Sequence, residues 1–160
     1  MIKKVIAMSC MEALQYVVFN RTNVEDFAII SIQEFETNGN GFKFVASGCC
    51  KDVLTMQFSD VNPELFYEQG MEEELKTLIE TGKCKVFSGH EARQIKIFLK
   101  QIMKNESIET LIVHCSAGVS RSPAIAAAIS KHLFGNDNEF WEKQLPNKYI
   151  YNLMLNDLEN

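Results

Sequence analysis

Apolar residues recur along this chain in two patterns, continuous runs and helically spaced stripes. The runs at 27–32 and 110–113 are nearly uninterrupted, as in strands that are buried on both faces of a parallel sheet. A third run, 53–58, leads to Asp60, and the first residues of the chain predict an N-terminal strand. Because segments of helical spacing separate these runs, the sequence predicts an α/β fold with a central, mostly parallel sheet flanked by helices.

Helically spaced stripes occupy the intervals between the predicted strands. Apolar positions predict helices at 91–102 and 149–158. Ser9 with Glu12 forms the capping-box pattern that starts a helix directly after the first strand. Residues 135–138, Gly-Asn-Asp-Asn, predict the end of a further helix.

Two other segments are less regular. Residues 63–82 predict an additional helical stretch whose solvated face carries three consecutive glutamates, 72–74. Its apolar positions are Phe66, Met71, Leu75, Leu78 and Ile79. Residues 37–41 predict a loop or hairpin turn before 42–45.

The chemistry of the chain is concentrated in residues 114–123, His-Cys-Ser-Ala-Gly-Val-Ser-Arg-Ser-Pro, between a predicted strand and a predicted helix. A cysteine that leaves a strand, followed by small residues and an arginine at a helix start, places a thiol inside a ring of backbone N–H groups. Such a ring binds a tetrahedral dianion and favours the thiolate form of Cys115. The planar fork of Arg121 matches two phosphoryl oxygens. Ser122 can cap the helix or donate a hydrogen bond to the cysteine sulfur.

Residues 114–122, HCSAGVSRS, resemble the Cys-x5-Arg signature of the protein tyrosine phosphatases, in the HCxAGxSRS form common in the dual-specificity branch. The resemblance implies a dual-specificity phosphatase-like fold and a two-step reaction through a phosphocysteine, with no metal and no cofactor. It implies that Cys115, Arg121 and Ser122 are catalytic. It also implies a phosphate-binding loop of Ser116, Ala117, Gly118, Val119, Ser120 and Arg121. A looser similarity to small prokaryotic and phage members covers about 53–155 and includes Pro146-Asn147.

An aspartic acid on a loop after an upstream strand completes this family's mechanism, because it protonates the leaving oxygen and later activates water. Asp60 is the candidate in this chain, with 63–82 as an insertion that separates it from the signature. Glu64 and Asp52 compete with it, although Asp52 precedes its strand and ligands bind at the carboxyl ends of parallel strands. A helix cap or a surface turn is the alternative interpretation of Asp60.

The histidines and the other cysteines predict no further site. Adjacent strand residues face opposite sides, so we expect His114 to support the loop from behind rather than to act as a base for Cys115. His90 and His132 show no metal-ligand spacing. The five cysteines, Cys10, Cys49, Cys50, Cys84 and Cys115, form no disulfide framework, which favours a reducing, cytoplasmic location. The sequence leaves open whether another cysteine traps an oxidised Cys115.

Size and charge limit the remaining possibilities. A chain of 160 residues, 46% of them hydrophobic, predicts a single phosphatase domain over 1–160. The net charge of −5 argues against nucleic acid or an anionic membrane as a partner, and no stretch has the length of a membrane span. Phe140 and Trp141 are interpreted as packing residues. The oligomeric state is left open.

The sequence therefore favours hydrolysis of phosphate monoesters on a phosphorylated protein or peptide, with phosphotyrosine favoured. The loop residues 116–120 carry no basic side chain, whereas phosphatases of inositol lipids or RNA ends often have distinctive residues there. The main alternative is a catalytically inactive phosphopeptide-binding module of the same fold. Arsenate reductases and low-molecular-weight phosphatases place their cysteine near the N-terminus, and a sulfur transferase does not need Asp60.

Overall fold

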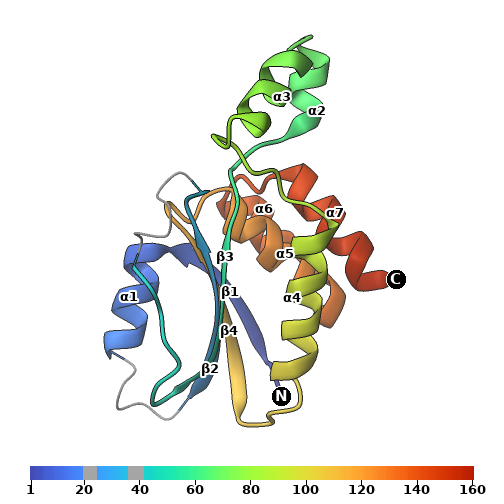
Figure 1. Cartoon of the computed structure of the whole chain (residues 1–160). Coiled ribbons are helices and arrows are strands. Elements are labelled where there is room, and N and C mark those ends of the chain that lie inside the picture. Colours follow the sequence, from blue (N-terminus) through green and yellow to red (C-terminus); the bar gives the residue numbers. More distant parts are fainter. Residues whose placement is uncertain (20–24, 36–41) are drawn as a thin grey trace.

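A four-stranded sheet, parallel throughout, forms the centre of the computed structural model (Figure 1), which describes residues 1–19, 25–35 and 42–160. The strands follow the order β1-β4-β2-β3 across the sheet. Their bounds are β1 Lys4–Ser9, β2 Asp26–Gln33, β3 Cys50–Gln57 and β4 Ile108–Cys115. The predicted fold class, a parallel sheet with flanking helices, is confirmed. The central strands β2 and β4 are the two apolar runs that the sequence marks as buried on both faces.

Helices cover both faces of the sheet, as Figure 1 shows. Helix α1 (Cys10–Phe19) covers one face. Helices α4 (Gly89–Ile102) and α5 (Arg121–Phe134) cover the other, and α7 (Lys148–Glu159) packs against both of them. A short helix, α6 (Asn138–Lys143), follows α5 and was not predicted. Among the described residues, no helix combines the length and apolarity needed to cross a membrane.

The sheet separates two apolar clusters. The larger lies between the sheet and the helices α4, α5 and α7, and includes the side chain of Cys115. The smaller lies under α1 and includes Phe27, Ile29 and Phe44. Phe44 belongs to the segment 42–45, which forms no strand but packs over the sheet; the predicted turn at 37–41 falls outside the described residues.

Helix boundaries follow local hydrogen bonds that the sequence encodes. The Ser9 N–H donates to the Glu12 carboxylate (2.7 Å) and the Glu12 N–H donates to Ser9 Oγ (3.2 Å), which is the predicted capping box. Ser88 and Glu91 form a second capping box at the start of α4. Helix α5 ends at Gly135, whose φ of 74° lies in the left-handed region that glycine tolerates.

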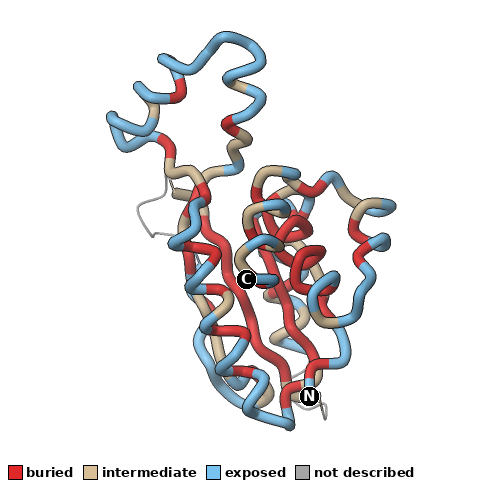
Figure 2. Tube along the Cα trace, turned by 90° about the vertical axis from the view of Figure 1, so that its right-hand side faces the viewer, coloured by how far each residue is buried: buried red, intermediate tan, exposed pale blue. Residues whose placement is uncertain are grey.

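A helical arm projects from the carboxyl end of the sheet (Figures 1 and 2). We use "arm" for residues 63–82, which the sequence predicts as one helical stretch. The structure instead contains two helices, α2 (Pro63–Glu68) and α3 (Glu72–Glu80), because Gly70, with a φ of 69°, reverses the chain between them. Most of the arm is exposed, as the pale blue trace in Figure 2 shows.

Candidate active site

The chain between β4 and α5 curls around the thiol of Cys115. The Gly118 N–H donates to Cys115 Sγ at 3.3 Å, and Ser122 Oγ lies 3.2 Å from the same sulfur. Cys115 is 2% exposed, so the thiol lies at the bottom of the loop. The Gly118 N–H and the first turn of α5 thus lie beside this sulfur, an arrangement that favours a negative charge there.

Close packing against β1 fixes the shape of this loop. Gly118 has a φ of 71°, and a Cβ atom there would lie 2.5 Å from the Met8 carbonyl carbon. Glycine is therefore required both by the backbone angle and by the space. The Cys10 N–H donates to the Ser116 carbonyl (3.3 Å) from the neighbouring strand end, which holds the other side of the loop.

Arg121, the first residue of α5, is 5% exposed and presents part of its fork to the loop. Its Nη1 donates to the Phe58 carbonyl (3.0 Å) and to Glu34 Oε2 (3.3 Å), and its Nη2 donates to Glu34 Oε1. Its Nε is buried and has no hydrogen-bond partner among the described residues. A buried donor without an acceptor is rare in folded proteins, so this N–H is available for a ligand oxygen.

Glu34, at the carboxyl end of β2, is a site residue that the sequence reasoning missed. Its carboxylate accepts hydrogen bonds from both Nη atoms of Arg121 and from Ser116 Oγ. Burial raises the pKa of Glu34, but the bonds from Arg121 and Ser116 outweigh it and hold the pKa below the ordinary value. The strand-end rule that selected Asp60 applies equally to Glu34, which follows the buried run 27–32.

Asp60 lies at the rim of the loop, three residues after the end of β3. Its Oδ1 accepts hydrogen bonds from Ser120 Oγ (2.8 Å) and Asn147 Nδ2 (3.0 Å). No described residue hydrogen-bonds to its Oδ2, which leaves that oxygen for a proton or a substrate atom. Asn147 also donates to the Val61 carbonyl (3.3 Å), so it holds the whole Asp60 segment. In the sequence, Asn147 stood out only as part of the Pro146-Asn147 pair of the looser similarity, with no role assigned to it.

The two competing acids lie elsewhere. Asp52 sits near the start of β3, where its Oδ2 accepts from Gln101 Nε2 at 2.7 Å. Glu64 is exposed in the first turn of α2, beyond the Asn62 side chain that caps this helix. Asp60 is therefore the one of these three carboxylates that contacts the loop.

Ser122 faces the sulfur rather than the end of its helix. The N-cap residue of α5 is Ser120, and no side chain caps this helix. Of the two roles open to Ser122 from the sequence, the geometry is that of a hydrogen-bond partner of Cys115, in which either atom can donate; the Met8 carbonyl, 3.3 Å from Ser122 Oγ, is an acceptor for the hydroxyl.

Comparison with known proteins finds solved structures that are similar in fold. No protein-family model and no curated sequence matches the chain. The human tyrosine phosphatase-like serine/threonine/tyrosine-interacting protein is similar in structure, with a TM-score of 0.51 and 17% identity over 91% of this chain and 80% of that one. The complex of PTPMT1 with PI(5)P gives 0.54 and 12% over 98% and 90%. Tk-PTP in its active form gives 0.52 and 11% over 98% and 90%.

The chain has the fold of the cysteine-dependent phosphatases. The predicted resemblance is confirmed at the level of the fold, and identities this low carry no further conclusion about activity.

His114 lies behind the 116–121 loop, as expected from its position on β4. Its Nε2 lies 2.7 Å from Ser31 Oγ, and its ring packs on Phe44 with 4.8 Å between ring centroids. Burial lowers the pKa of His114, so the neutral ring is favoured. Cys10 lies near the loop as well; burial and then the charge of Cys115 raise the pKa of its thiol.

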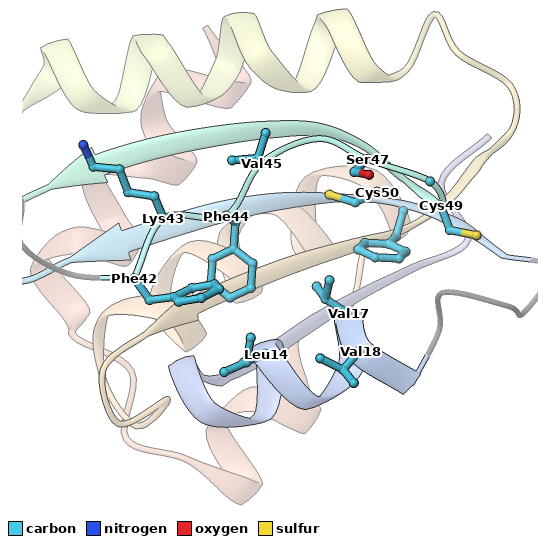
Figure 3. Close-up of a pocket in the computed structure, with 12 residues that line it drawn as sticks. Leu14, Val17, Val18, Phe42, Lys43, Phe44, Val45, Ser47, Cys49 and Cys50 are labelled. Atoms are coloured by element: carbon cyan, nitrogen blue, oxygen red, sulfur yellow. The ribbon is translucent and has the colours of Figure 1, made fainter.

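A separate apolar cavity of about 580 Å³ lies between α1 and the segment 42–50 (Figure 3). Leu14, Val17 and Val18 of α1 form one wall, and Phe42 and Phe44 form part of the other. None of the residues that line this cavity belongs to the phosphatase loop. Burial raises the pKa of the Cys50 thiol, in its wall, to about 11, so this thiol stays protonated near neutral pH.

Proposed function

We propose that this protein hydrolyses phosphate monoesters on proteins, with phosphotyrosine favoured, through a phosphocysteine at Cys115. The observation that carries the proposal is the pairing of a loop-bound thiol with a buried, partly unsatisfied arginine. Cys115 Sγ accepts the Gly118 N–H, and Arg121 keeps Nε without a partner beside it. A phosphoryl group bound between them would satisfy that donor and lie next to the sulfur.

In the first step, the Cys115 thiolate attacks phosphorus, an S–P bond forms and the bond to the leaving oxygen breaks. Arg121 and the loop N–H groups stabilise the charge on the equatorial oxygens. Asp60 donates its proton to the leaving oxygen from Oδ2, the oxygen that no described side chain occupies.

In the second step, water attacks the phosphocysteine and Asp60 accepts the proton of that water. The S–P bond breaks and inorganic phosphate leaves. Ser122 donates to the departing sulfur across the 3.2 Å that separates Oγ from Sγ. The thiolate is regenerated, so the cycle needs water alone as co-substrate.

Two features support phosphotyrosine over other esters. Cys115 is 2% exposed, so a long side chain delivers phosphorus to it more easily than a short one does. An aryl oxide is also a better leaving group than an alkyl oxide. One of the similar structures holds PI(5)P, so a phosphoinositide belongs in the test panel.

The test is phosphate release without added metal from an aryl phosphate, a phosphotyrosine peptide, a phosphoserine peptide and PI(5)P. We expect turnover with the aryl phosphate and the phosphotyrosine peptide, and none with Cys115→Ser. Asp60→Asn should lose about 10²- to 10⁴-fold on substrates with poor leaving groups.

The contrary results separate the alternatives. Phosphopeptide binding with no turnover by the intact chain would favour the inactive binding module. Faster turnover of PI(5)P than of either peptide would replace the protein substrate with a lipid. A near-normal rate for Asp60→Asn would assign the acid to another residue.

A further inference from the structure

The arm carries a strong and localised charge. Residues 63–82 contain six glutamates and one lysine, a net charge of −5 that equals the net charge of the whole chain. The rest of the molecule is therefore neutral overall. No salt bridge joins any of these glutamates to a described residue. An unneutralised helical hairpin of this kind attracts a cationic partner.

The arm also starts at the candidate active site. Asp60 is followed by Val61 and by Asn62, the N-cap of α2, and the chain returns where the Ser59 N–H donates to the Lys85 carbonyl (2.8 Å). Burial raises the pKa of the Tyr149 phenol, in the first turn of α7, and the nearby Tyr67 and Glu64 of α2 raise it further. A substrate bound at the loop therefore lies beside the base of the arm.

Two cavities beside α3 share Leu78 as a lining residue. The first, about 410 Å³, is lined by Ser59, Val61, Leu78, Lys83 and Cys84 and so flanks Asp60. The second, about 440 Å³, is lined by Glu73, Glu74, Thr77 and Leu78. We call these together the α3 groove. Its floor is partly apolar, its far end is acidic, and its one basic lining residue, Lys83, lies at the end near Asp60.

We propose that the α3 groove binds a lysine- or arginine-containing segment of the phosphoprotein substrate, next to the phosphorylated residue. The proposal rests on the phosphatase function above and names its substrate class. The unpaired Glu73 and Glu74 complement a positively charged side chain, and the stem of a lysine or arginine packs on an apolar floor such as Leu78 and Val61 provide. The same negative field repels nucleic acid and anionic lipid.

Helix geometry predicts where the basic residues lie in the substrate. Helix α3 rises about 1.5 Å per residue, so Glu73 and Glu74 lie roughly 6–8 Å beyond Leu78 along its axis. An extended peptide covers that length with about two residues, and crossing the cavity beside Asp60 requires about two more. Basic residues should therefore lie roughly three to five positions from the phosphotyrosine.

The experiment compares phosphotyrosine peptides that differ only at those positions, on either side, where they carry lysine, glutamine or glutamate. We expect kcat/KM to be highest for the lysine peptides. In Glu73→Gln/Glu74→Gln, kcat/KM for these lysine peptides should fall roughly two- to tenfold, as expected for the loss of two exposed ion pairs. The preference should also weaken as ionic strength rises from about 0.02 M to about 0.5 M. Hydrolysis of a small aryl phosphate, which does not extend into the groove, should not change.

Two further variants keep the result interpretable. Glu106→Gln/Glu159→Gln removes the same charge from exposed glutamates outside the arm and should leave the lysine preference intact. Thr77→Arg adds a positive charge to the groove without altering the first turn of α3, and should reverse the preference. This variant remains informative if the double glutamine change unfolds the arm.

The outcomes distinguish an error in the groove proposal from an error in the proposed phosphatase function. Normal aryl phosphate turnover with equal rates for all peptides would overturn the groove proposal and leave the phosphatase intact. If no ester is hydrolysed, the phosphatase proposal is wrong, and peptide affinities for Cys115→Ser protein then decide the groove by themselves. A dimer in sedimentation that dissociates in Glu73→Gln/Glu74→Gln would show that a second copy, not substrate, occupies the groove.

Discussion

The hydroxyl of Ser122 faces two acceptors that it cannot serve together. Its Oγ lies 3.2 Å from Cys115 Sγ and 3.3 Å from the Met8 carbonyl oxygen, and a hydroxyl carries one proton. A charged acceptor forms the stronger hydrogen bond, so the proton moves to sulfur whenever Cys115 is a thiolate. This happens at the end of the second step, when the phosphocysteine releases the sulfur.

Ser122→Ala should therefore slow breakdown of the phosphocysteine more than its formation. We expect kcat to fall by about 10²-fold, the usual effect of removing one preorganised donor. Rapid mixing with a chromogenic aryl phosphate should then show a burst of aryl oxide close to one equivalent per enzyme. A uniformly slow reaction without a burst would place Ser122 in the first step instead.

Glu34 accepts hydrogen bonds from both Nη atoms of the Arg121 guanidinium, whose Nε has no partner among the described residues. Glu34→Gln keeps the size of the side chain but removes its charge and one acceptor. A hydrogen bond to a charged group contributes about 1.5–3 kcal/mol, so kcat/KM should fall by roughly 10- to 100-fold. Inhibition by inorganic phosphate should weaken in parallel.

The matched control for Glu34 is Glu109→Gln. Glu109 pairs with Lys3 at 2.6 Å at the opposite end of the sheet. This variant should hydrolyse aryl phosphate normally. An unchanged inhibition constant for phosphate in Glu34→Gln would show that Arg121 keeps its orientation without this carboxylate.

At the scale of elements, Asn147 joins three segments that are distant in sequence. Its backbone N–H donates to the Ser120 carbonyl (3.2 Å) in the loop, and its Nδ2 donates to Asp60 Oδ1 (3.0 Å). Its Oδ1 accepts from the Ile150 N–H (3.2 Å) and so caps α7. One residue thus sets the position of the candidate acid relative to the loop.

Asn147→Ala should show two separable effects. Loss of the cap should lower the free energy of unfolding by about 1 kcal/mol. Loss of the contact with Asp60 should lower kcat/KM for alkyl phosphates by about tenfold, with a smaller effect on aryl phosphates, whose leaving groups need less protonation. Serine is a good cap but too short for Asp60, so Asn147→Ser should restore stability alone. Recovery of both would make Asn147 a purely structural residue.

The elements that the sequence predicted well are those with strong local signals. The apolar runs of β2 and β4, the capping box of Ser9 and Glu12, and the glycine that ends α5 each depend on neighbouring residues. The prediction for the arm was less accurate. Helical spacing continues across 63–82, whereas the break between α2 and α3 depends on the single glycine at position 70. The segment 42–45 forms no strand; its Phe44 instead packs over the sheet in the smaller apolar cluster.

The candidate site also contains residues that a local signal predicts and residues whose position depends on the whole fold. Cys115, Arg121 and Ser122 are contiguous with a sequence signature, so their grouping was predictable. Glu34 and Asn147 were not assigned, because their roles depend on the order β1-β4-β2-β3 and on α7 returning to the loop. Strand-end position pointed to Asp60 correctly in space, and its catalytic role stays a prediction.

At the scale of the whole molecule, His114 lies where the 116–121 loop, the sheet and the segment 42–45 meet. Its ring is 1% exposed, its Nε2 lies 2.7 Å from Ser31 Oγ, and Phe44 packs on its face. Burial favours the neutral ring and lowers the pKa of His114 in the folded protein. In the unfolded chain the imidazole titrates near its ordinary value of about 6.5.

The sign of the resulting pH dependence is fixed by proton uptake. Below a pH of about 6.5, His114 binds a proton in the unfolded chain but stays neutral in the folded protein. The free energy of unfolding should therefore fall as the pH is lowered through that value. Carboxylates with lowered pKa values, such as Glu34 and Glu91, titrate below this window and do not contribute. We expect a lower midpoint of thermal unfolding at pH ~5.5 than at pH ~7.5.

His114→Gln keeps a polar group beside Ser31 but cannot bind that proton, so the difference between the two midpoints should shrink, even if both midpoints are lower. His132→Gln, which removes an exposed histidine from α5, should keep the full difference. If both variants behave alike, the acid sensitivity comes from groups other than His114. A larger difference in His114→Gln than in the intact protein would show that the buried ring binds a proton more readily in the folded protein than in the unfolded chain. In that case the hydrogen bond to Ser31 outweighs burial, and the ring behind the 116–121 loop is cationic at pH ~5.5.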